Sequence, residues 1–395
     1  MYKACNLAKN EFIKCYLCGV LCVSANCLKL HRLNVCCKIP KCEVCGSFKI
    51  KNHVCNGKWC LFCKSTVEID HRCFILTEDE NLIINKNSVK KTDGYIFFDY
   101  EAMQTSSGHQ VNLVCARKIC INCCNNEYCK IKLCGDFVWK TNEEFCEWLF
   151  SKENSNYTAL AHNMKGYDGF FILNYLVSNI IPSEKLPEIL LNGSKVLVIK
   201  FGSITIKDSI NFIPVGLSKI PKTFNLKELK KGFFPHLFNI PENQNYIGPM
   251  PDKKFYNHEF MNVKDRDNFF KWYDQQTGKS FNFQKELFDY CSSDVDILAK
   301  ACISFRSLFM SITKRNEQDT GVDPFAQCIT LPSACHYVYR RNFMKSQSIV
   351  NIQTHGYNCE TTSFKAIKWL KYIMLSEKLL IQHARNGVEK KFIII

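Results

Sequence analysis

The sequence lacks any apolar run long enough to cross a membrane, and its first five residues, Met-Tyr-Lys-Ala-Cys, do not begin a signal peptide. These absences exclude a membrane protein and favour a protein of the cell interior, for which we expect a nuclear location. Acidic residues are also scarce, because 37 Asp and Glu stand against 52 Lys and Arg and the formal net charge is +15. This basic excess favours a polyanionic partner, most simply nucleic acid.

Length and composition predict a folded chain of several domains. With 395 residues, 46% of them hydrophobic, the chain can form two or three domains that each have a core. A polar linker is expected at residues 81–92, a hairpin turn at the Asn-Gly pair 192–193, and amphipathic helices at 330–344 and 364–380. The predicted domains are residues 1–75, 90–310 and 320–395.

Cysteine is abundant and concentrated at one end. Of 25 cysteines, 13 lie in the first 73 residues, interleaved with histidine, and in an intracellular chain this pattern indicates zinc rather than disulfides. A Cys-x2-Cys-x7-His-x-Cys spacing occurs twice, and four such ligands match a closed tetrahedral zinc site. The two predicted sites consist of Cys42, Cys45, His53 and Cys55, and of Cys60, Cys63, His71 and Cys73.

Two further cysteine groups predict additional sites, which brings the expected number of zinc ions to between two and four. One lies near the N-terminus, where Cys22 and Cys27 compete as ligands, and the other lies in a Cys-rich insertion at 115–134, where a β-hairpin would turn and Cys124 is an alternative ligand. The first group is Cys15, Cys18, His31 and either Cys36 or Cys37. The second group is Cys120, Cys123, Cys129 and Cys134.

Residues 95–103 predict a buried strand that ends in two acids. The stretch is rich in aromatic and branched residues, and 110–118 is expected to be its antiparallel neighbour. Because side chains alternate along a strand, Asp99 and Glu101 project from the same face. Adjacent carboxylates repel each other unless cations lie between them, and oxygen ligands suit Mg²⁺ or Mn²⁺. A strand that ends in solvated acids is the alternative interpretation.

A second acidic element lies at a turn between a strand and a helix. A short apolar strand ends at His162 and Asn163, and a glycine turn then opens a helix with Tyr167 and Asp168 in its first turn. The helix dipole favours an acid at this position, so an isolated Asp168 would be structural.

A third acidic element lies inside a helix. Tyr290 and Asp294 are four residues apart and share a helix face, which Leu287 and Leu298 continue. This places Asp294 on the side that faces the core, where an acid is costly unless it binds metal or is hydrogen-bonded. Asp296 lies about half a turn away and is expected to be solvated or a cap partner.

Taken in this order, the three acidic elements resemble the three exonuclease motifs of family B DNA polymerases. The motifs are Asp-x-Glu on a strand, Asn-x3-Tyr-Asp at a turn and Tyr-x3-Asp on a helix. More narrowly, the chain is similar to the protein-primed branch, and within it to the Polinton/Maverick transposon group. That group also carries Cys/His clusters ahead of the motifs and stretches like 239–244 and 369–385. The resemblance covers essentially the whole chain.

The resemblance implies an α/β fold. A ribonuclease H-like exonuclease domain with a mixed sheet would be preceded by small zinc-finger modules and followed by the helical beginning of a polymerase module. It also implies two Mg²⁺ or Mn²⁺ ions, with Tyr290 orienting the attacking water in a two-metal phosphodiester cleavage. The residues that would hold these ions are Asp99, Glu101, Asp168 and Asp294.

The resemblance further implies contacts with DNA, as a single-stranded 3′ end or a primer-template, and a terminal protein as a partner of the parent polymerase. Residues 208–213 look like the Ser/Thr-Leu-x2-hydrophobic DNA-binding motif, with Ile210 in place of Leu. The branch also uses a lysine between the second and third motifs, for which Lys253 and Lys254 compete. The residues assigned to DNA are His162, Asn163, Tyr167, Ser209, Ile210 and Ile213.

The sequence has no Tyr-x-Asp-Thr-Asp type motif, which the polymerase module of this family carries. The chain stops where that module would begin, so we expect a fragment of a replicative DNA polymerase, a nucleotidyltransferase, with proofreading 3′→5′ exonuclease activity and no polymerisation of its own. One alternative is a non-enzymatic, zinc-dependent nucleic-acid-binding protein with a vestigial nuclease domain. Another is a nuclease that acts on RNA.

Overall fold

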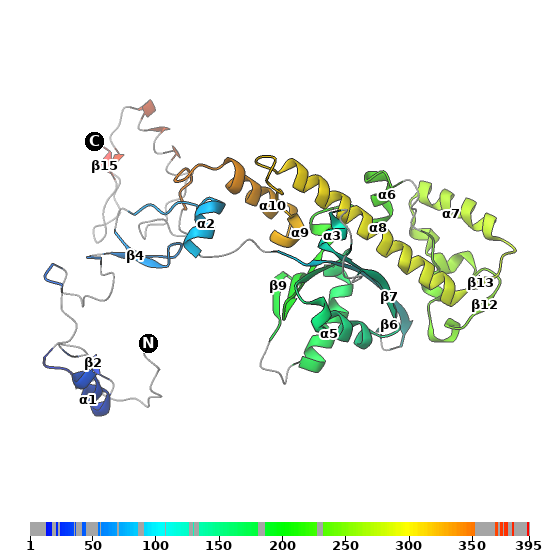
Figure 1. Ribbon diagram of the computed structural model, residues 1–395, viewed down its shortest axis with the longest axis horizontal. Helices are drawn as coiled ribbons and strands as arrows, with labels where there is room; N and C mark the ends of the chain where they lie inside the picture. The colour runs from blue at the N-terminus through cyan, green and yellow to red at the C-terminus, as the bar shows by residue number, and fades with distance from the viewer. Residues whose placement is uncertain are drawn as a thin grey trace. The chain divides into compact units, whose positions relative to one another are not determined.

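The chain, shown in Figure 1 as a computed structural model, divides into two compact units. One unit comprises Met1–Leu76 and Lys345–Ile395, and the other comprises Thr77–Met344. In the part of the chain that the structure describes, no helix combines the length and apolar character needed to span a membrane. The described residues are 13–17, 21–22, 24–34, 36, 42–44, 54–55, 57–68, 71–85, 91–106, 108–125, 129, 134–180, 186–226, 232–351, 368–369, 372–373, 375–377, 381–382 and 393–394.

Among its described residues, the first unit contains strands of two or three residues and one ten-residue helix. β1 pairs with β2, β3 with β4, and β14 with β15, each antiparallel, and Phe74 forms an isolated bridge with Val350. Strands of two or three residues bury little apolar surface, so metal binding is the expected source of folding free energy here. The elements are β1 Ile13–Lys14, β2 Leu21–Cys22, α1 Ala25–Asn34, β3 Lys58–Cys60, β4 Ser65–Val67, β14 Ile381–Gln382 and β15 Ile393–Ile394.

The second unit is built on a mixed seven-stranded sheet with the order β7-β6-β5-β8-β11-β10-β9. β5, β8 and β11 are parallel to one another, and the other neighbouring pairs are antiparallel. The predicted acidic strand, its antiparallel neighbour and the Asn-Gly hairpin are thereby confirmed. The strands are β5 Gly94–Thr105, β6 Gly108–Cys120, β7 Gly135–Trp139, β8 Tyr157–Ala161, β9 Glu188–Asn192, β10 Lys195–Phe201 and β11 Ile204–Asp208.

Successive side chains of β5 point to opposite faces of the sheet and so belong to two different apolar cores. Ile96 and Phe98 face the core that contains α4 (Asn142–Leu149) and α5 (Asp168–Ile180). Tyr95 and Phe97 face the other core, which contains α8 (Phe283–Ile312). Helices therefore cover both faces of the sheet, and the odd-numbered face of β5, which also carries the two acids, looks toward α8 (Figure 1).

The remaining elements of this unit connect or flank these strands and helices. They are α2 Glu78–Asn85, α3 Ile121–Cys124, α6 Ile220–Thr223, α7 Val263–Gln276, α9 Pro324–Gln327, α10 Leu331–Val338, β12 Ile247–Gly248 and β13 Phe281–Asn282, the 3₁₀ turns η1 Lys152–Asn154, η2 Met164–Gly166, η3 Ser209–Asn211, η4 Leu217–Lys219, η5 His236–Phe238, η6 Pro241–Asn243, η7 Lys253–Tyr256 and η8 His258–Phe260, and the π-helical turn η9 Tyr339–Phe343.

Two sequence predictions are wrong in this unit. The supposed linker at 81–92 begins as a helix, because α2 continues to Asn85; Glu78 at its start pairs with Arg340 at 3.0 Å. Asp296 is not left in solvent, since its carboxylate forms ion pairs with Arg117 of β6 and, at 2.9 Å, with Lys300. The helix predicted at 330–344 is confirmed as α10 and η9, whereas most of the one predicted at 364–380 lies outside the described residues.

Candidate active site

The three parallel strands end at the same edge of the sheet. In the parallel pairing of β5 with β8, Phe97 lies opposite Leu160. In the pairing of β8 with β11, Ala161 lies opposite Asp208. Because the carboxyl ends of parallel strands meet at one edge, the residues that follow lie side by side. These residues are Asp99 and Glu101 on β5, His162 and Asn163 after β8, and Ser209 and Ile210 after β11.

A cleft of about 620 Å³ opens at this edge, between the sheet and α8. Asp168, Ser209 and Ile213 do not line it. Several residues that sequence reasoning did not assign do line it, among them Gln104, His109 and His236. Eight predicted site residues from all three motifs form its walls: Asp99, Glu101, His162, Asn163, Tyr167, Ile210, Tyr290 and Asp294.

Helix periodicity brings the third motif against the first. Tyr290, Cys291 and Asp294 are all buried on the face of α8 that packs on β5 and β6. The Cys291 thiol donates a hydrogen bond to the backbone oxygen of Asp99 at 3.5 Å. Its sulfur and one carboxylate oxygen each of Asp99 and Glu101 lie within 4.8 Å of one another. The helix therefore sits directly over the two acids of the strand.

Asp168 lies behind the cleft wall rather than on it. Its side chain is 3% exposed, and Oδ1 is buried and accepts no hydrogen bond. Burial raises the pKa of Asp168 to about 7, against backbone hydrogen bonds from Asp168 itself and Tyr100 that lower it. Tyr100 stands between Asp99 and Glu101 on β5, so this carboxylate lies beside the acidic strand and has an oxygen available for a ligand.

The cleft is electrostatically negative. Burial, together with the charges of Glu101, Asp168 and Asp99, raises the pKa of Tyr167 to about 12. Among the described residues that line the cleft there is no lysine or arginine. Lys253, one of the two lysine candidates, lies elsewhere and pairs with Asp274 at 3.3 Å. A cleft that gathers carboxylates and holds no lysine or arginine is suited to divalent cations.

The wall of the cleft that is formed by the turns after β8 and β11 is held together by Asp208, the last residue of β11. Its carboxylate is fully buried and accepts hydrogen bonds from the backbone N–H groups of Asn163 and Ile210, both at 3.0 Å, and of Lys165 at 2.9 Å. It thereby ties the turn after β8 to the turn after β11. Asn163 has a left-handed backbone with φ of 67°, a conformation that asparagine tolerates better than most residues.

His162 and Ser209 form a connected pair in this wall. The His162 Nε2 lies 2.9 Å from the carbonyl oxygen of Val215, which can only accept, so Nε2 carries a proton. In the neutral ring Nδ1 then accepts a hydrogen bond from the Ser209 hydroxyl at 2.9 Å. Ser209 is fully buried and Ile213 is 4% exposed. Ser209 and Ile213 support the wall from inside, and Ile210 is the residue of this motif that reaches the cleft.

Two tyrosine–histidine pairs stand in the cleft. The Tyr290 hydroxyl lies 3.3 Å from the Nε2 of His236, and its ring stacks on Phe234 with centroids 5.3 Å apart. The Tyr167 hydroxyl lies 3.2 Å from the Nδ1 of His109. Both histidines come from segments without a recognisable sequence signal, so only the folded structure identifies them.

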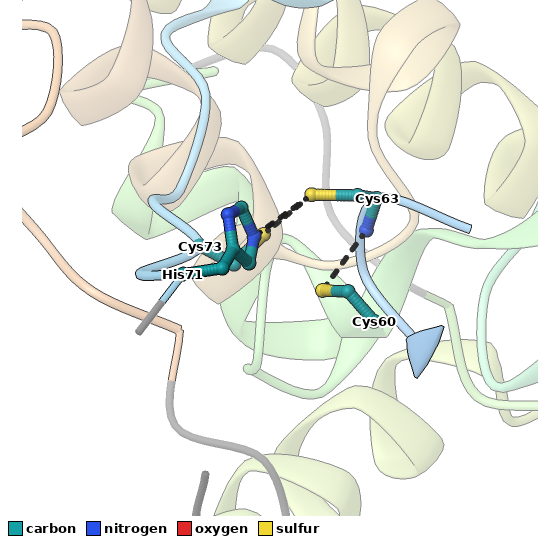
Figure 2. Close-up of side chains that lie close together, drawn as sticks. All are labelled: Cys60, Cys63, His71 and Cys73. Carbon is teal, nitrogen blue, oxygen red and sulfur yellow. Dashed lines mark hydrogen bonds between the residues drawn. The ribbon is translucent and has the colours of Figure 1, made fainter. Parts of the chain in front are cut away.

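The second Cys/His repeat is assembled as a compact cluster in the first unit. Figure 2 shows hydrogen bonds that join Cys63 to each of the other three residues, and the Cys63 sulfur lies 3.3 Å from both the His71 Nε2 and the Cys73 sulfur. Cys60 accepts a hydrogen bond from the backbone N–H of Cys63 at 3.4 Å, and all four ligand atoms lie within 4.8 Å of one another. The structure therefore brings together every residue of this predicted site.

The Cys-rich insertion between β6 and β7 is assembled as well. Its sulfur–sulfur distances are 3.8 Å for Cys120 and Cys129, 3.7 Å for Cys129 and Cys134, and 3.5 Å for Cys123 and Cys134. A tetrahedral zinc site with metal–sulfur bonds of about 2.3 Å separates its sulfur atoms by about 3.8 Å. Cys124, the alternative ligand, is instead buried in the apolar core.

The two other predicted zinc sites are described in part. Cys15, His31 and Cys36 have ligand atoms within 4.8 Å of one another, while Cys18 lies outside the described residues. Cys42 and Cys55 have sulfur atoms 3.1 Å apart, while Cys45 and His53 lie outside the described residues.

Comparison with known proteins gives a consistent result. Residues 150–365, more than half of the chain, match the family described as DNA polymerase type B, organellar and viral. The chain is 25% identical over 248 residues to a probable DNA polymerase of Ascobolus immersus, and 29% identical over 208 residues to one of Agaricus bitorquis. These alignments cover 59% and 51% of this chain but 19% and 24% of the relatives, so the chain spans about a fifth to a quarter of their length.

Solved polymerase structures are more distant. Phi29 DNA polymerase complexed with primer-template DNA and incoming nucleotides is 16% identical, with a TM-score of 0.33 over 54% of this chain and 31% of that chain. The family B DNA polymerase of Pyrobaculum calidifontis is 10% identical, with a TM-score of 0.31 over 64% of this chain and 30% of that chain.

Proposed function

The chain belongs to the family of type B DNA polymerases of organelles and viruses, and we propose that its unit Thr77–Met344 is a two-metal 3′→5′ exonuclease that removes nucleotides from DNA ends. The observation that carries the proposal is the single cleft in which Asp99, Glu101 and Asp294 meet Tyr290. Residues nearly two hundred positions apart in the sequence supply these groups, which chance alone rarely brings together.

The carboxylates fit a pair of Mg²⁺ or Mn²⁺ ions. Asp99 and Glu101 place oxygen atoms within 4.8 Å of each other, and Asp168 keeps one buried oxygen that accepts no hydrogen bond. These two strand acids with Asp168 and Asp294 would hold the ions, since oxygen ligands are the kind that such cations prefer. When bound, the ions activate water and stabilise the leaving 3′ oxygen of an in-line displacement.

The remaining residues position the substrate. Tyr290, fixed by His236 and Phe234, directs its hydroxyl into the cleft and orients the attacking water. Tyr167 and Ile210 present an aromatic ring and an apolar side chain to unpaired nucleotides, and the Asn163 amide is suited to backbone contacts. His162 acts through Ser209 by fixing the turn that carries Ile210.

The proposal is tested by digestion of a single strand labelled at its 5′ end, with Mg²⁺ or with EDTA. Wild type should shorten the strand stepwise from the 3′ end, and Asp99→Ala or Asp294→Ala should lower the rate by several orders of magnitude, because each removes metal-held charge stabilisation. Asp267→Ala, on the exposed surface of α7, is the matched control and should digest normally. Digestion that persists in the Asp99→Ala protein would refute the site. A labelled RNA strand decides between DNA and RNA as substrate.

The cysteine clusters are proposed to bind zinc. The sulfur separations in the Cys120 group are close to those of tetrahedral coordination, and the four ligand atoms of the Cys60 group are gathered within 4.8 Å of one another. The Cys15 and Cys42 groups supply part of the same pattern. No disulfide occurs among the described cysteines. We also propose, from the sequence resemblance, that the parent enzyme is protein-primed and of the transposon type, that it has a terminal protein as partner, and that it acts in the nucleus.

A further inference from the structure

We infer that Asn239 is a positioning residue that fixes the Glu101 end of the acidic strand relative to α8. This inference rests on the proposed exonuclease function. Asn239 is 1% exposed and lies in the turn between η5 and η6, far in the sequence from any of the three acidic motifs. It does not line the cleft, so it acts through neighbouring groups rather than on the substrate.

The strand needs support at this point because its regular pairing is interrupted. β8 pairs with β5 only from Gly94 to Phe97, so β5 runs past the end of β8 before it reaches Glu101. On the other side, the register with β6 shifts between Glu101 and Ala102, which leaves Asn112 as an extra residue. A bulge of this kind re-aims the adjacent side chains and recurs next to active sites.

Asn239 supplies hydrogen bonds to both strands where their regular pairing is interrupted. Its side-chain amide donates to the backbone oxygen of Ala102 at 3.1 Å, and its own backbone oxygen accepts from the N–H of Gln104 at 2.9 Å. Its Oδ1 accepts from the extra residue, Asn112, at 2.8 Å. One buried side chain and its backbone therefore hold both strands of the bulge immediately after Glu101.

The same network reaches the helix that carries Asp294 and Tyr290. Gln244 donates to the Oδ1 of Asn239 at 2.9 Å and accepts from Asn112 at 2.9 Å. The backbone oxygen of Gln244 accepts from the side chain of Gln284, in the first turn of α8, at 2.8 Å. Asn239 thus links the element that presents Glu101 with the element that presents Asp294.

The test combines metal binding with digestion. Asn239→Ala should raise the dissociation constant for Mn²⁺, measured by titration calorimetry, by about tenfold, the size of effect typical of residues that orient metal ligands. The single-turnover digestion rate should fall, while affinity for single-stranded DNA in EDTA stays within about twofold of wild type. Asn243→Ala is the matched control, because Asn243 lies in the same segment and its side chain donates to the backbone oxygen of Phe238 at 3.0 Å rather than to a residue of the bulge.

A second variant separates positioning from general loss of fold. In a Glu101→Gln background, Asn239→Ala should add no further loss of Mn²⁺ affinity, because the group it positions is already gone. An equal loss in both backgrounds, or wild-type affinity in Asn239→Ala, would overturn the inference. If Asn239→Ala does not fold, Gln244→Ala should raise the dissociation constant for Mn²⁺ by about two- to threefold. An unchanged dissociation constant in Gln244→Ala would equally refute the link. Unchanged digestion by Glu101→Gln alone would instead refute the proposed function.

Discussion

At the scale of single residues, Asp168 carries the clearest energetic consequence. Its pKa is about 7 in the folded chain, because burial disfavours the charged form, while the ordinary value is 3.8. Between these values the folded state binds more protons than the unfolded state. The free energy of unfolding of the metal-free protein therefore falls as the pH rises from about 4 to about 7 and is level above that. At about 1.4 kcal/mol for each pKa unit, the loss is about 4 kcal/mol at most.

We expect Asp168→Asn to remove this pH dependence, since the amide does not titrate. Urea unfolding of metal-free protein at pH 4.5 and at pH 7.5 provides the measurement, with the exposed Asp267→Asn as the control that should behave as wild type. The loss of stability should also disappear when wild type is saturated with Mn²⁺, which favours the charged carboxylate. The same loss in wild type and in Asp168→Asn would show that another group is responsible.

The residues that sequence reasoning identified share a local signal. Asp99, Glu101 and Asp294 stand out because strand and helix periods place them on apolar faces, and the structure brings them to one cleft. His236 and Asn239 have no such signal, because their partners Tyr290 and Ala102 are distant in the sequence. Asp296 was misjudged for the same reason, since its partner Arg117 comes from a strand that no local pattern connects with α8.

At the scale of elements, the connection between β6 and β7 joins the edge strand β7 to its neighbour in the sheet through a cluster of thiols. The sheet pairs Gly94 at the start of β5 with Cys120, and the backbone N–H of Ile121 donates to the oxygen of Asp93 at 2.9 Å. A metal ion held there would fix the start of the acidic strand from the side opposite to the cleft. The four cysteines are only partly buried, so metal binding is the expected source of the order of this cluster.

We predict at least two zinc ions in residues 1–75 and one more at Cys120, Cys123, Cys129 and Cys134. Elemental analysis of protein purified without added metal measures the total, and Cys63→Ser and Cys123→Ser should each lower it by one. Cys335→Ser, an exposed thiol outside every cluster, should leave it unchanged. A total that neither cluster variant reduces would contradict these assignments.

A chelator distinguishes the two units. We expect metal removal to unfold the first unit, whose strands have two or three residues, and to leave the sheet of the second unit folded on its two apolar cores.

At the scale of the whole molecule, the family includes polymerases, yet two of the acids after α8, Asp319 and Asp323, are committed to structural contacts. Asp323 forms an ion pair with Arg306 at 2.5 Å and accepts from Tyr95 at 2.7 Å. Asp319 pairs with Arg341 at 2.7 Å, and this guanidinium holds the pKa of Asp319 well below its usual range. Neither is available as one of the paired metal ligands that nucleotide transfer requires.

We therefore predict that this 395-residue chain does not extend a primer. The assay uses a primer-template with all four deoxynucleotides and the Asp99→Ala protein, so that degradation does not mask synthesis. Any template-dependent product longer than the primer would reveal a polymerase site elsewhere in the chain.

The strand order of the sheet also determines how much of the chain must be synthesised before the sheet can form. Its centre is formed by β5, β8 and β11, which are joined in parallel although residues 106–156 and 162–203 separate them in the chain. Parallel pairing over such separations is slow, because the loop must close before the contacts form. During synthesis the face of β5 that carries Tyr95 and Phe97 remains uncovered until α8 has left the ribosome. Chaperones that bind extended apolar segments should therefore determine the yield of soluble protein more than the stability of the finished fold.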